Sequence, residues 1–557
     1  MTTWKMDVEQ LVTDLSACGR FQVLLTAITY LVKTAGSWAM MMMAFGSFHP
    51  GWTCTDLETM DGNKSQNLSS FLWSRPLQSH YDLSGVSLNA SLNGNVSSFS
   101  LTPGPGARGD LTLGRANFTQ DTCTELSGCR NVTINSDSQT VATEWSLVCD
   151  RAWILSFIIS IQMSGVAIGS YFCGYFGDRY GRKLSMYSSL ALGVISNTVV
   201  YFTTSWEMFT VVRFFIGLSV GGNLALSQIY PMEFVMPKWR PVVSGFPSWH
   251  VGTLLFGVCV MLLRDWRLVQ LATAALSLLA LLTAVWVPDS VRWLLVHGRV
   301  RKAERVVTQI CRFNGMEVPD TQVSLINITE GSNHRQEKSA KFSFFQLFHA
   351  SLRKRTLLVT LTFFLTSAMF YTLSFGVQSL YGDFYLNFIL YSLFPIPLSF
   401  LVPVLGNKLG RQRALLIFFI LVFLGFVSIV VIFFTTSGSL RGITITCLAL
   451  FTANWLQQTL SLLNTFAVEL FPTVVRNLAF GFAMTGARLG SVIAPYVIPR
   501  DFDSMYVSYL IMSAMALVCC VAVWALPETK GTAMEDIIQD KNEKTSKAEK
   551  QVNSNAD

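Results

Sequence analysis

The chain has 557 residues, of which 51% are hydrophobic and 13% charged, and its mean hydropathy is +0.43. An ordinary soluble domain has roughly 25% charged residues, so the composition argues against a soluble protein and for a membrane protein. The net charge of +7 gathers in particular loops and forms no interleaved basic and aromatic face, so we expect no nucleic-acid partner.

The first twenty residues mix Lys5, Asp7, Glu9 and Asp14 with apolar positions. A cleaved secretion signal has a basic start and a small-residue exit instead, so we expect this segment to stay on the chain. Apolar windows of about 20 residues, the length that crosses a hydrocarbon core as a helix, then follow one another along the sequence. They number twelve: 21–46, 152–176, 184–204, 207–231, 241–263, 268–287, 356–378, 384–405, 414–435, 442–468, 477–499 and 505–526.

Basic residues set the expected orientation, because cytoplasmic loops are rich in Lys and Arg. The turns after spans two, four and eight and the long 288–355 loop carry such residues and lie on one side. We therefore expect both termini in the cytoplasm and the protein in the plasma membrane. The predicted organisation is a cytoplasmic segment 1–20, a first half 21–287 with an extracellular loop 47–150, a cytoplasmic loop 288–355, a second half 356–526 and a cytoplasmic tail 527–557.

The first large loop has the composition of an extracellular segment. It contains six glycosylation acceptor sequences, at Asn63, Asn67, Asn89, Asn95, Asn117 and Asn131. It also contains four of the eleven cysteines, Cys54, Cys123, Cys129 and Cys149. In an oxidising compartment these imply two disulfides, and three pairings are open. A glycosylated cap is the favoured interpretation of the loop; a ligand-binding role is the alternative.

Three motifs recur with nearly one period, which predicts two homologous halves. "EFVMPKWR" and "ELFPTVVR" each place a glutamate seven residues before an arginine, 236 residues apart. The turn "GYFGDRYGRK" at 174–183 has a weaker copy in "GNKLGRQR" at 406–413, and "PDSVRWL" at 288–294 corresponds to "PETKG" at 527–531. The chain is thus predicted to be a duplication of six spans plus six.

Together these motifs, with the R-x-x-x-G of Arg213 and Gly217, resemble the major facilitator superfamily. "TEWSLVCDR", "RDWRLVQL", "AVELFPTVVRN" and "ARLGSVIAPY" resemble its organic-ion solute carriers, the cation, carnitine and anion transporters, and specifically their anion branch. The resemblance runs from Phe21 to about residue 540. It implies an all-α membrane protein of twelve transmembrane helices in two pseudo-symmetric six-helix bundles. Asp289 and Val291 depart from the usual Glu and Pro, and the second copy of the turn lacks its Asp.

Charges at the cytoplasmic ends of the spans predict a breakable latch between the halves. Ion pairs at a membrane edge are made and broken within a few kcal/mol, whereas apolar packing between helices gains little in lipid. The predicted latch comprises Asp178, Arg182, Glu233, Arg240, Arg292, Glu469, Arg476 and Glu528. Anchoring of loops by positive charge is the alternative. It accounts for Arg179 and Lys183 but not for the glutamates, because acidic residues contribute little to topology.

Two cations lie deep inside predicted spans and no Asp or Glu does. Arg488 has eleven residues of its span on either side, and Lys33 is almost as central. Each buried charge costs roughly 2.5–3.5 kcal/mol without a partner, so an anionic substrate is the natural counter-charge. The resemblance agrees, because the position of Arg488 is basic in the anion and carnitine carriers. Snorkelling of Lys33 and packing of Arg488 against carbonyls are the alternatives; Arg213 and His250 are expected to be structural.

Aromatic and amide side chains are expected to complete the pocket, because rings give shape-tolerant contact and amides orient polar groups. The predicted set is Trp249, Phe370, Tyr371, Asn454, Trp455 and Gln458. The resemblance also implies an aromatic pair at Phe370 and Tyr371. Each residue alone is equally well explained by packing between helices.

The sequence predicts an alternating-access carrier of small organic anions, working by exchange for an internal anion and needing no cofactor or metal. Exchange is favoured because moving one negative charge into a negative-inside cell costs about 2.3 kcal/mol per 100 mV. A carrier of zwitterions or cations such as carnitine, and a receptor-like relative without transport, are the alternatives. Catalytic motifs such as HExxH are absent from the sequence, so we expect no enzyme. The oligomeric state is left open.

Overall fold

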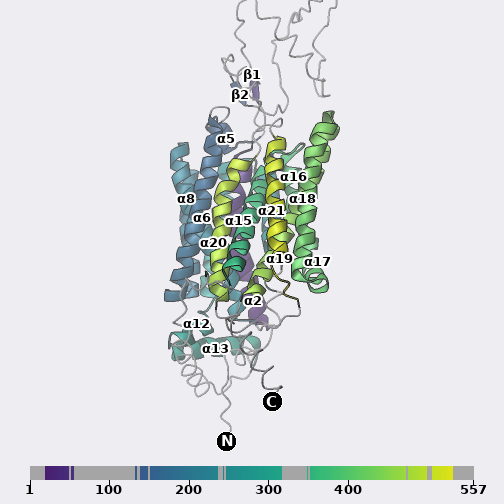
Figure 1. Cartoon of the computed structure of the whole chain (residues 1–557). Coiled ribbons are helices and arrows are strands. Elements are labelled where there is room, and N and C mark those ends of the chain that lie inside the picture. The colour runs from purple at the N-terminus through teal and green to yellow at the C-terminus, as the bar shows by residue number, and fades with distance from the viewer. Residues whose placement is uncertain are drawn as a thin grey trace, which may run out of the picture.

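A computed structural model describes residues 19–48, 52–54, 132–134, 138–147, 151–235, 243, 246–316, 348, 352–471, 475–498 and 505–530. Long helices run side by side through this part of the chain (Figure 1). Two short strands, β1 (Trp52–Cys54) and β2 (Val132–Ile134), pair antiparallel with Thr53 opposite Thr133. They mark one end of the bundle (Figure 1).

The first half contributes six long helices. They are α2 (Arg20–Gly46), α6 (Trp153–Tyr180), α7 (Arg182–Tyr201), α8 (Trp206–Ile229), α10 (Ser248–Leu263) and α11 (Trp266–Leu282). Three shorter helices lie before or after these long helices: α5 (Val141–Glu144), η2 (Tyr230–Glu233) and η3 (Thr283–Val285). Two helices, α12 (Val291–Val296) and α13 (Val300–Asn314), then lie beneath the bundle at the end away from the strands (Figure 1).

The second half repeats this arrangement. Its helices are α15 (Arg353–Gly376), α16 (Phe384–Leu393), α17 (Pro395–Leu409), α18 (Arg411–Thr435), α19 (Gly438–Leu470), α20 (Arg476–Val497) and α21 (Met505–Trp524), with η5 (Val377–Ser379) after α15. Because α16 and α17 follow one another along one apolar stretch, Phe384–Leu409, the half has six spans.

Ten helical stretches of the described chain are long and apolar enough to cross a membrane. Two predicted spans differ from that standard. Helix α10 has only 16 residues, and α19 has 33 residues but carries the amides Asn454, Gln457 and Gln458, which lower its hydropathy. Each of the twelve predicted spans forms helix within its described residues, so the predicted all-α membrane fold is confirmed.

The duplication is visible in two matching turns. Gly181 ends α6 and begins α7 with φ 116°, and Gly410 separates α17 from α18 with φ 98°. A residue with a side chain rarely adopts this region of backbone space, so both turns require glycine. The two glycines are 229 residues apart, the spacing at which the sequence motif recurs.

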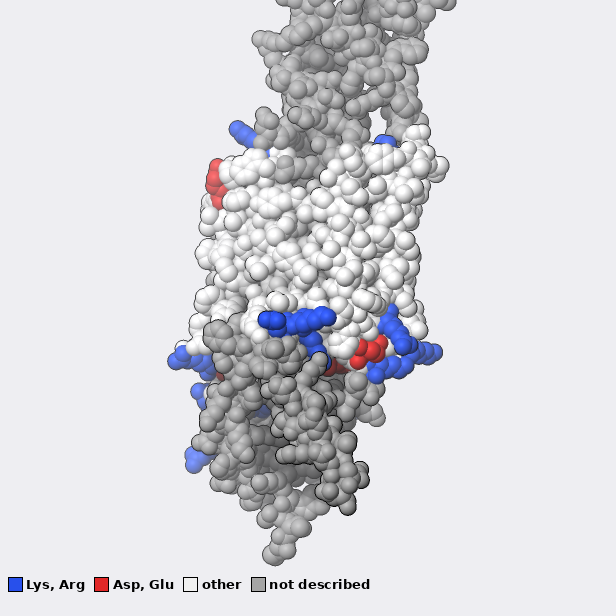
Figure 2. All heavy atoms as spheres, viewed as in Figure 1, with Lys and Arg blue, Asp and Glu red and all other residues white. Residues whose placement is uncertain are grey.

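Charged side chains gather at the two ends of the bundle and leave an uncharged band between them (Figure 2). Many apolar side chains on the long helices are exposed; Tyr171, Ile195 and Leu424 are examples. An exposed apolar surface of this extent is expected where lipid is the solvent. The bundle therefore has the surface of a protein that spans a bilayer.

Candidate functional site

Arg488 is half-buried on α20, in the middle of the bundle. Its guanidinium interacts with the hydroxyl of Tyr371 on α15. Within the described residues no carboxylate forms an ion pair with it. Arg488 is thus a deep cation without a described acidic partner, and it lies beside a predicted pocket residue; the anion site stays a prediction.

Tyr371 connects this cation to both halves. It is 7% exposed, and its hydroxyl lies 4.0 Å from the Sδ atom of Met40 on α2 in the first half. Its ring makes an edge contact with Phe370 at 4.9 Å and stacks with Phe375 at 6.0 Å between centroids. The predicted aromatic pair is therefore part of one buried aromatic group next to Arg488.

A second tyrosine extends the polar edge of this group. Tyr391 on α16 shares a hydrogen bond of 2.6 Å with the hydroxyl of Ser374 on α15, and it lies within electrostatic reach of Tyr371. Sequence reasoning missed Tyr391, because a single tyrosine in an apolar span gives no signal. The hydroxyls of Tyr371 and Tyr391 add hydrogen-bonding capacity beside the guanidinium.

Lys33 lies in the middle of α2 and is 9% exposed. Its Nζ donates to the Oε1 of Gln228 on α8 at 2.7 Å and lies 5.6 Å from the ring centroid of Tyr30. No described carboxylate is paired with it. The predicted cation thus has a neutral amide as its partner and keeps its formal charge uncompensated.

The helices that carry the two cations each have a glycine with open space beside it. A Cβ atom added to Gly36, three residues after Lys33, would meet no atom within 4 Å, and the same holds at Gly481, two turns from Arg488 along α20. Met40 lies seven residues beyond Lys33, about 10 Å along a helix. Each cation therefore has, on its own helix, one position with open space beside the backbone.

Arg213 on α8 shows what a structural buried arginine looks like in the same bundle. It is fully buried, donates to the carbonyl of Ala39 at 3.3 Å and to the Oε1 of Gln270 at 3.2 Å, and contacts the Sδ of Met42. Its guanidinium also lies 4.9 Å from the ring of Phe209. Every partner belongs to the first half, in agreement with the expected structural role.

The other predicted pocket residues have separate surroundings. Trp455 packs against Phe418 and Phe451, and Gln458 donates to the carbonyl of Pro395 at 3.1 Å, where it joins α19 to α17. Trp249 is half-buried against the common core. Asn454 has a buried Oδ1 without a hydrogen-bond partner, so of these four it has the clearest unmet polar group.

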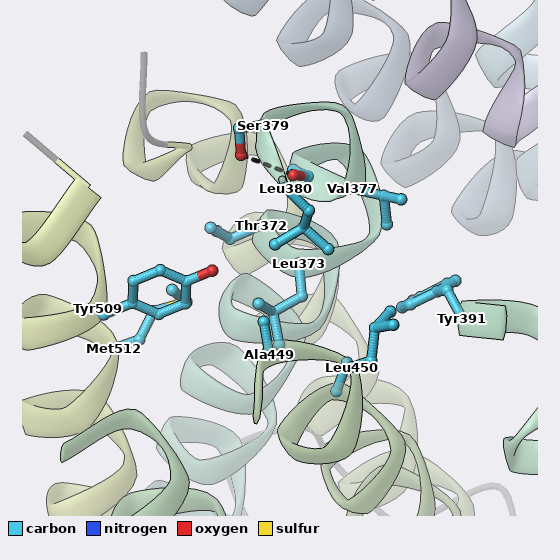
Figure 3. A pocket seen from close by; sticks show the side chains of 12 residues that line it. Thr372, Leu373, Val377, Ser379, Leu380, Tyr391, Ala449, Leu450, Tyr509 and Met512 are labelled. Atoms are coloured by element: carbon cyan, nitrogen blue, oxygen red, sulfur yellow. Dashed lines mark hydrogen bonds between the residues drawn. The ribbon is translucent and has the colours of Figure 1, made fainter. Parts of the chain in front are cut away.

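A small cavity lies inside the second half (Figure 3). It has a volume of about 10 Å³ and is lined by residues of α15, α16, α19 and α21, among them Thr372, Tyr391 and Tyr509. The hydroxyl of Tyr509 points into it, and Ser379 closes one side with a hydrogen bond to the Gly376 carbonyl (Figure 3). A space of this size holds a single water molecule, so it is not the substrate site.

Ion pairs form at the end of the bundle where α13 lies, here called the α13 end. Each pair of described residues stays within one half. Arg182 contacts Asp178 at 2.6 Å and Glu233 at 3.4 Å. In the second half Arg411 contacts Glu469 at 3.0 Å. Arg411, which was not among the predicted latch residues, stands where the repeat places the counterpart of Arg182.

The remaining latch residues do not add an ion pair between the halves in the described chain. Glu528 accepts hydrogen bonds from the backbone N–H groups of Arg411, Gln412, Thr529 and Lys530 and caps the start of α18. Arg292 is exposed. Arg240 and the side chain of Arg476 lie outside the described residues. The latch between halves stays a prediction.

The halves meet instead at the end of the bundle where β1 and β2 lie, here called the strand end. Ser156 and Ser160 of α6 donate to the carbonyls of Pro495 and Val492 of α20, at 3.0 and 2.8 Å. Phe48 stacks on Phe384 with centroids 4.7 Å apart. Helices α10 and α16 also meet here, where a Cβ on Gly257 would touch Phe388 at 3.0 Å.

The predicted glycosylation sites and three of the loop cysteines lie outside the described residues. They are Asn63, Asn67, Asn89, Asn95, Asn117, Asn131, Cys123, Cys129 and Cys149. Cys54 is described only through its backbone in β1, where it pairs with Val132. The glycan and disulfide predictions therefore stay predictions.

Helices that pass through an apolar band in two matching sets of six, with buried cations that have no carboxylate partner among the described residues, define a membrane transporter of the major facilitator fold. The chain belongs to the Sugar (and other) transporter family, whose model matches residues 117–540. The fold and the family are those of transporters and not of enzymes.

Curated relatives confirm the resemblance to organic-ion solute carriers. The chain is 27% identical to mouse solute carrier family 22 member 4 over 403 residues, which cover 72% of each protein. It is 29% identical to human solute carrier family 22 member 16, covering 75% of this chain and 73% of the relative. It is also 29% identical to rabbit organic anion transporter 3, covering 73% and 75%.

Solved structures agree in fold. The partially occluded inward-open form of the xylose transporter XylE from E. coli matches with a TM-score of 0.59 and 16% identity, covering 92% of this chain and 99% of that one. An inward-open form of the same transporter matches with a TM-score of 0.56 and 20% identity, covering 71% and 92%.

Proposed function

We propose that the protein carries small organic anions across the plasma membrane by alternating access, with both termini in the cytoplasm. The observation that carries the proposal is the pair Arg488 and Tyr371. A guanidinium at mid-depth, without a described carboxylate partner and beside a phenol hydroxyl, is suited to bind a carboxylate or sulfonate by charge-assisted hydrogen bonds.

Lys33 supports the same assignment. Its only described hydrogen-bond partner is the neutral amide of Gln228, so the interior carries two positive groups that cargo would neutralise. The names of the relatives include organic anion transporter 3 as well as organic cation/carnitine transporter 2. A second candidate function follows: a zwitterion with its carboxylate on Arg488 and its ammonium against the rings of Phe370 and Tyr371.

The closed strand end and the ion pairs confined to each half at the α13 end support an inward-facing state of such a carrier. Exchange is the proposed mode, because the exit of an internal anion cancels the charge that the entering anion moves against the membrane potential. The proposed latch would form across the α13 end in the opposite state.

Uptake of radiolabelled benzoate, tetraethylammonium and carnitine into transfected cells tests the proposal. We expect benzoate uptake, and we expect Arg488→Gln to lower it about tenfold or more, since a hydrogen bond to a charged group contributes roughly 1.5–3 kcal/mol and 1.4 kcal/mol is tenfold. Arg488→Lys should retain part of the rate. Lys354→Gln, which removes an exposed cation, is the matched control, and surface labelling normalises expression.

Other outcomes would select the alternatives. Carnitine uptake that depends on Arg488, without benzoate uptake, would establish the zwitterion carrier. Tetraethylammonium uptake that survives Arg488→Gln would contradict the anion assignment. Release of preloaded benzoate that external benzoate does not accelerate would contradict exchange. Normal surface expression without uptake of any compound would indicate a receptor-like relative.

A further inference from the structure

The segment 138–147 brings the chain back from the first loop to the bundle, and it is deeply embedded in the strand end. Thr140, Val141 and Ala142 have no exposed surface. Thr140 begins α5 as its N-cap, where its hydroxyl oxygen accepts from the backbone N–H of Thr143 at 3.2 Å. A return segment this buried is part of the folded core of the first half.

The segment is attached first to the end of α2. The hydroxyl of Thr140 donates to the carbonyl of Phe48 at 2.8 Å in a fully buried hydrogen bond. The side chain of Val141 packs against Gly46, where an added Cβ would lie 3.2 Å from Cγ2 of Val141. The position of Phe48 is therefore set by this segment.

It is attached second to the turn between α10 and α11. The backbone N–H of Gln139 donates to the carbonyl of Arg264 at 2.9 Å, and that of Trp266 donates to the carbonyl of Gln139 at 3.1 Å. Arg264 has a positive φ of 53°, a conformation that a non-glycine residue keeps only when its surroundings hold it.

Glu144, near the other end of the segment, bonds it to the start of α11. Its carboxylate accepts from Nε1 of Trp266 at 2.7 Å and from Nη2 of Arg267 at 2.5 Å. Arg267 also donates to the carbonyl of Thr203 at 2.7 Å, which ties in the turn between α7 and α8. Charge-assisted bonds of this kind are about twice as strong as neutral ones.

Both elements held in this way contact α16 in the other half. Phe48 stacks on Phe384 with an interplanar angle of 22°. The guanidinium of Arg264 lies 5.8 Å from the ring centroid of Tyr385. One buried segment therefore positions both residues, Phe48 and Arg264, that contact aromatic rings of the other half.

We propose that residues 138–147 act as a brace for the outer gate of the carrier, with Glu144 as its positioning residue. The gate contacts of Phe48 and Arg264 exist only when the strand end is closed. Because the brace already holds these two residues in place, less conformational entropy is lost when the gate closes. The brace adds no contact that would favour the open state. The brace thereby favours the inward-facing state.

This inference rests on the proposed alternating access and not on the identity of the cargo. A thiol reporter measures gate opening without any substrate. Phe388 is 2% exposed on α16, where its ring lies 5.8 Å from that of Phe256 of α10 and 5.9 Å from that of Phe384, the residue that Phe48 contacts. Phe388→Cys therefore becomes reactive toward a membrane-impermeant, charged thiol reagent only when the strand end opens.

The test compares labelling rates in intact cells for Phe388→Cys alone and combined with Glu144→Gln. We expect labelling about tenfold faster with Glu144→Gln, the change that corresponds to ~1.4 kcal/mol. Glu207→Gln, an exposed glutamate at the same end without a described ion pair, is the matched control and should leave the rate unaltered. Protein without Phe388→Cys corrects for native cysteines.

Trp266→Phe is a second variant, which removes the Nε1 donor to Glu144 and replaces a fully buried indole by a smaller ring. It provides the same comparison if Glu144→Gln does not reach the cell surface. Unaltered labelling in a surface-expressed brace variant overturns the inference, and so does equal acceleration by Glu207→Gln. Accelerated labelling in a protein that carries no anion would leave the brace standing while contradicting the proposed substrate.

Discussion

Arg411 and Glu469 form in the second half, at 3.0 Å, the ion pair that Arg182 and Glu233 form in the first half at 3.4 Å. Each pair joins the start of the helix after a glycine turn to the end of the fourth span of its half. The first half adds Asp178, 2.6 Å from Arg182. The second half has Asn407 at the matching place in the motif, so its arginine has one carboxylate fewer.

The side chain of Asp178 is 69% exposed. Among the predicted latch residues it is therefore a carboxylate that can change its partner at little cost. We expect Asp178→Asn to lower the maximal uptake rate by up to about fivefold, the effect of an exposed ion pair of 0.2–1 kcal/mol, with little change in the substrate concentration at half-maximal rate. Concentration dependence of uptake measures both. Lys183→Gln is the control, and equal rates for wild type and Asp178→Asn would refute the latch.

Arg213 is predicted to act in stability and not in substrate choice. Arg213→Gln leaves the Ala39 carbonyl and Gln270 without their donor inside the first half. We expect a loss of about 1–3 kcal/mol, typical when a buried hydrogen-bonding group is left without its partner. Melting temperature of purified protein measures this. A variant that melts like wild type but changes substrate preference would contradict the assignment.

Glu528 should give the protein a specific acid sensitivity. Burial alone would raise the pKa of its carboxyl, but hydrogen bonds from the backbone N–H groups of Lys530, Gln412, Arg413 and Thr529 lower that pKa below the ordinary 4.5. A group with a depressed folded pKa stabilises the protein above its unfolded pKa, and this contribution is lost as pH falls through the folded pKa.

We therefore expect Glu528→Gln to lower the free energy of unfolding by about 1–2 kcal/mol at neutral pH, as for loss of a helix cap. The difference from wild type should shrink when pH falls below about 4.5. Thermal melts in detergent between pH 7 and that range measure it, with Glu207→Gln as control. A pH-independent difference would show that the charge of Glu528 is not the stabilising feature.

The contact between α15 and α20 is predicted to depend on Gly490. A Cβ there would overlap the carbonyl oxygen of Phe364, whereas a Cβ on Gly481 of the same helix would meet nothing within 4 Å. We expect Gly490→Ala to destabilise the second half by about 1–3 kcal/mol, the usual cost of overpacking, and Gly481→Ala to be neutral or slightly stabilising. Equal melting temperatures for the two variants would contradict this packing.

The candidate site was only partly predictable. Arg488 and Lys33 stand out in the sequence, because a charge inside a long apolar window is rare and needs no neighbour to be noticed. Gln228, Met40 and Tyr391 give no such signal. They became part of the site only where α2, α8 and α16 brought them next to the two cations and Tyr371.

The sequence by itself determined the twelve helices and their duplication, because the length of an apolar window and the positions of glycine turns are local properties that lipid converts directly into helical spans. Only the tertiary structure decided which charges are paired, because pairing depends on distances between segments far apart in the chain. Arg182 and Arg411 are satisfied within their own halves, Arg213 is enclosed by one bundle, and the guanidinium of Arg488 has no described carboxylate partner.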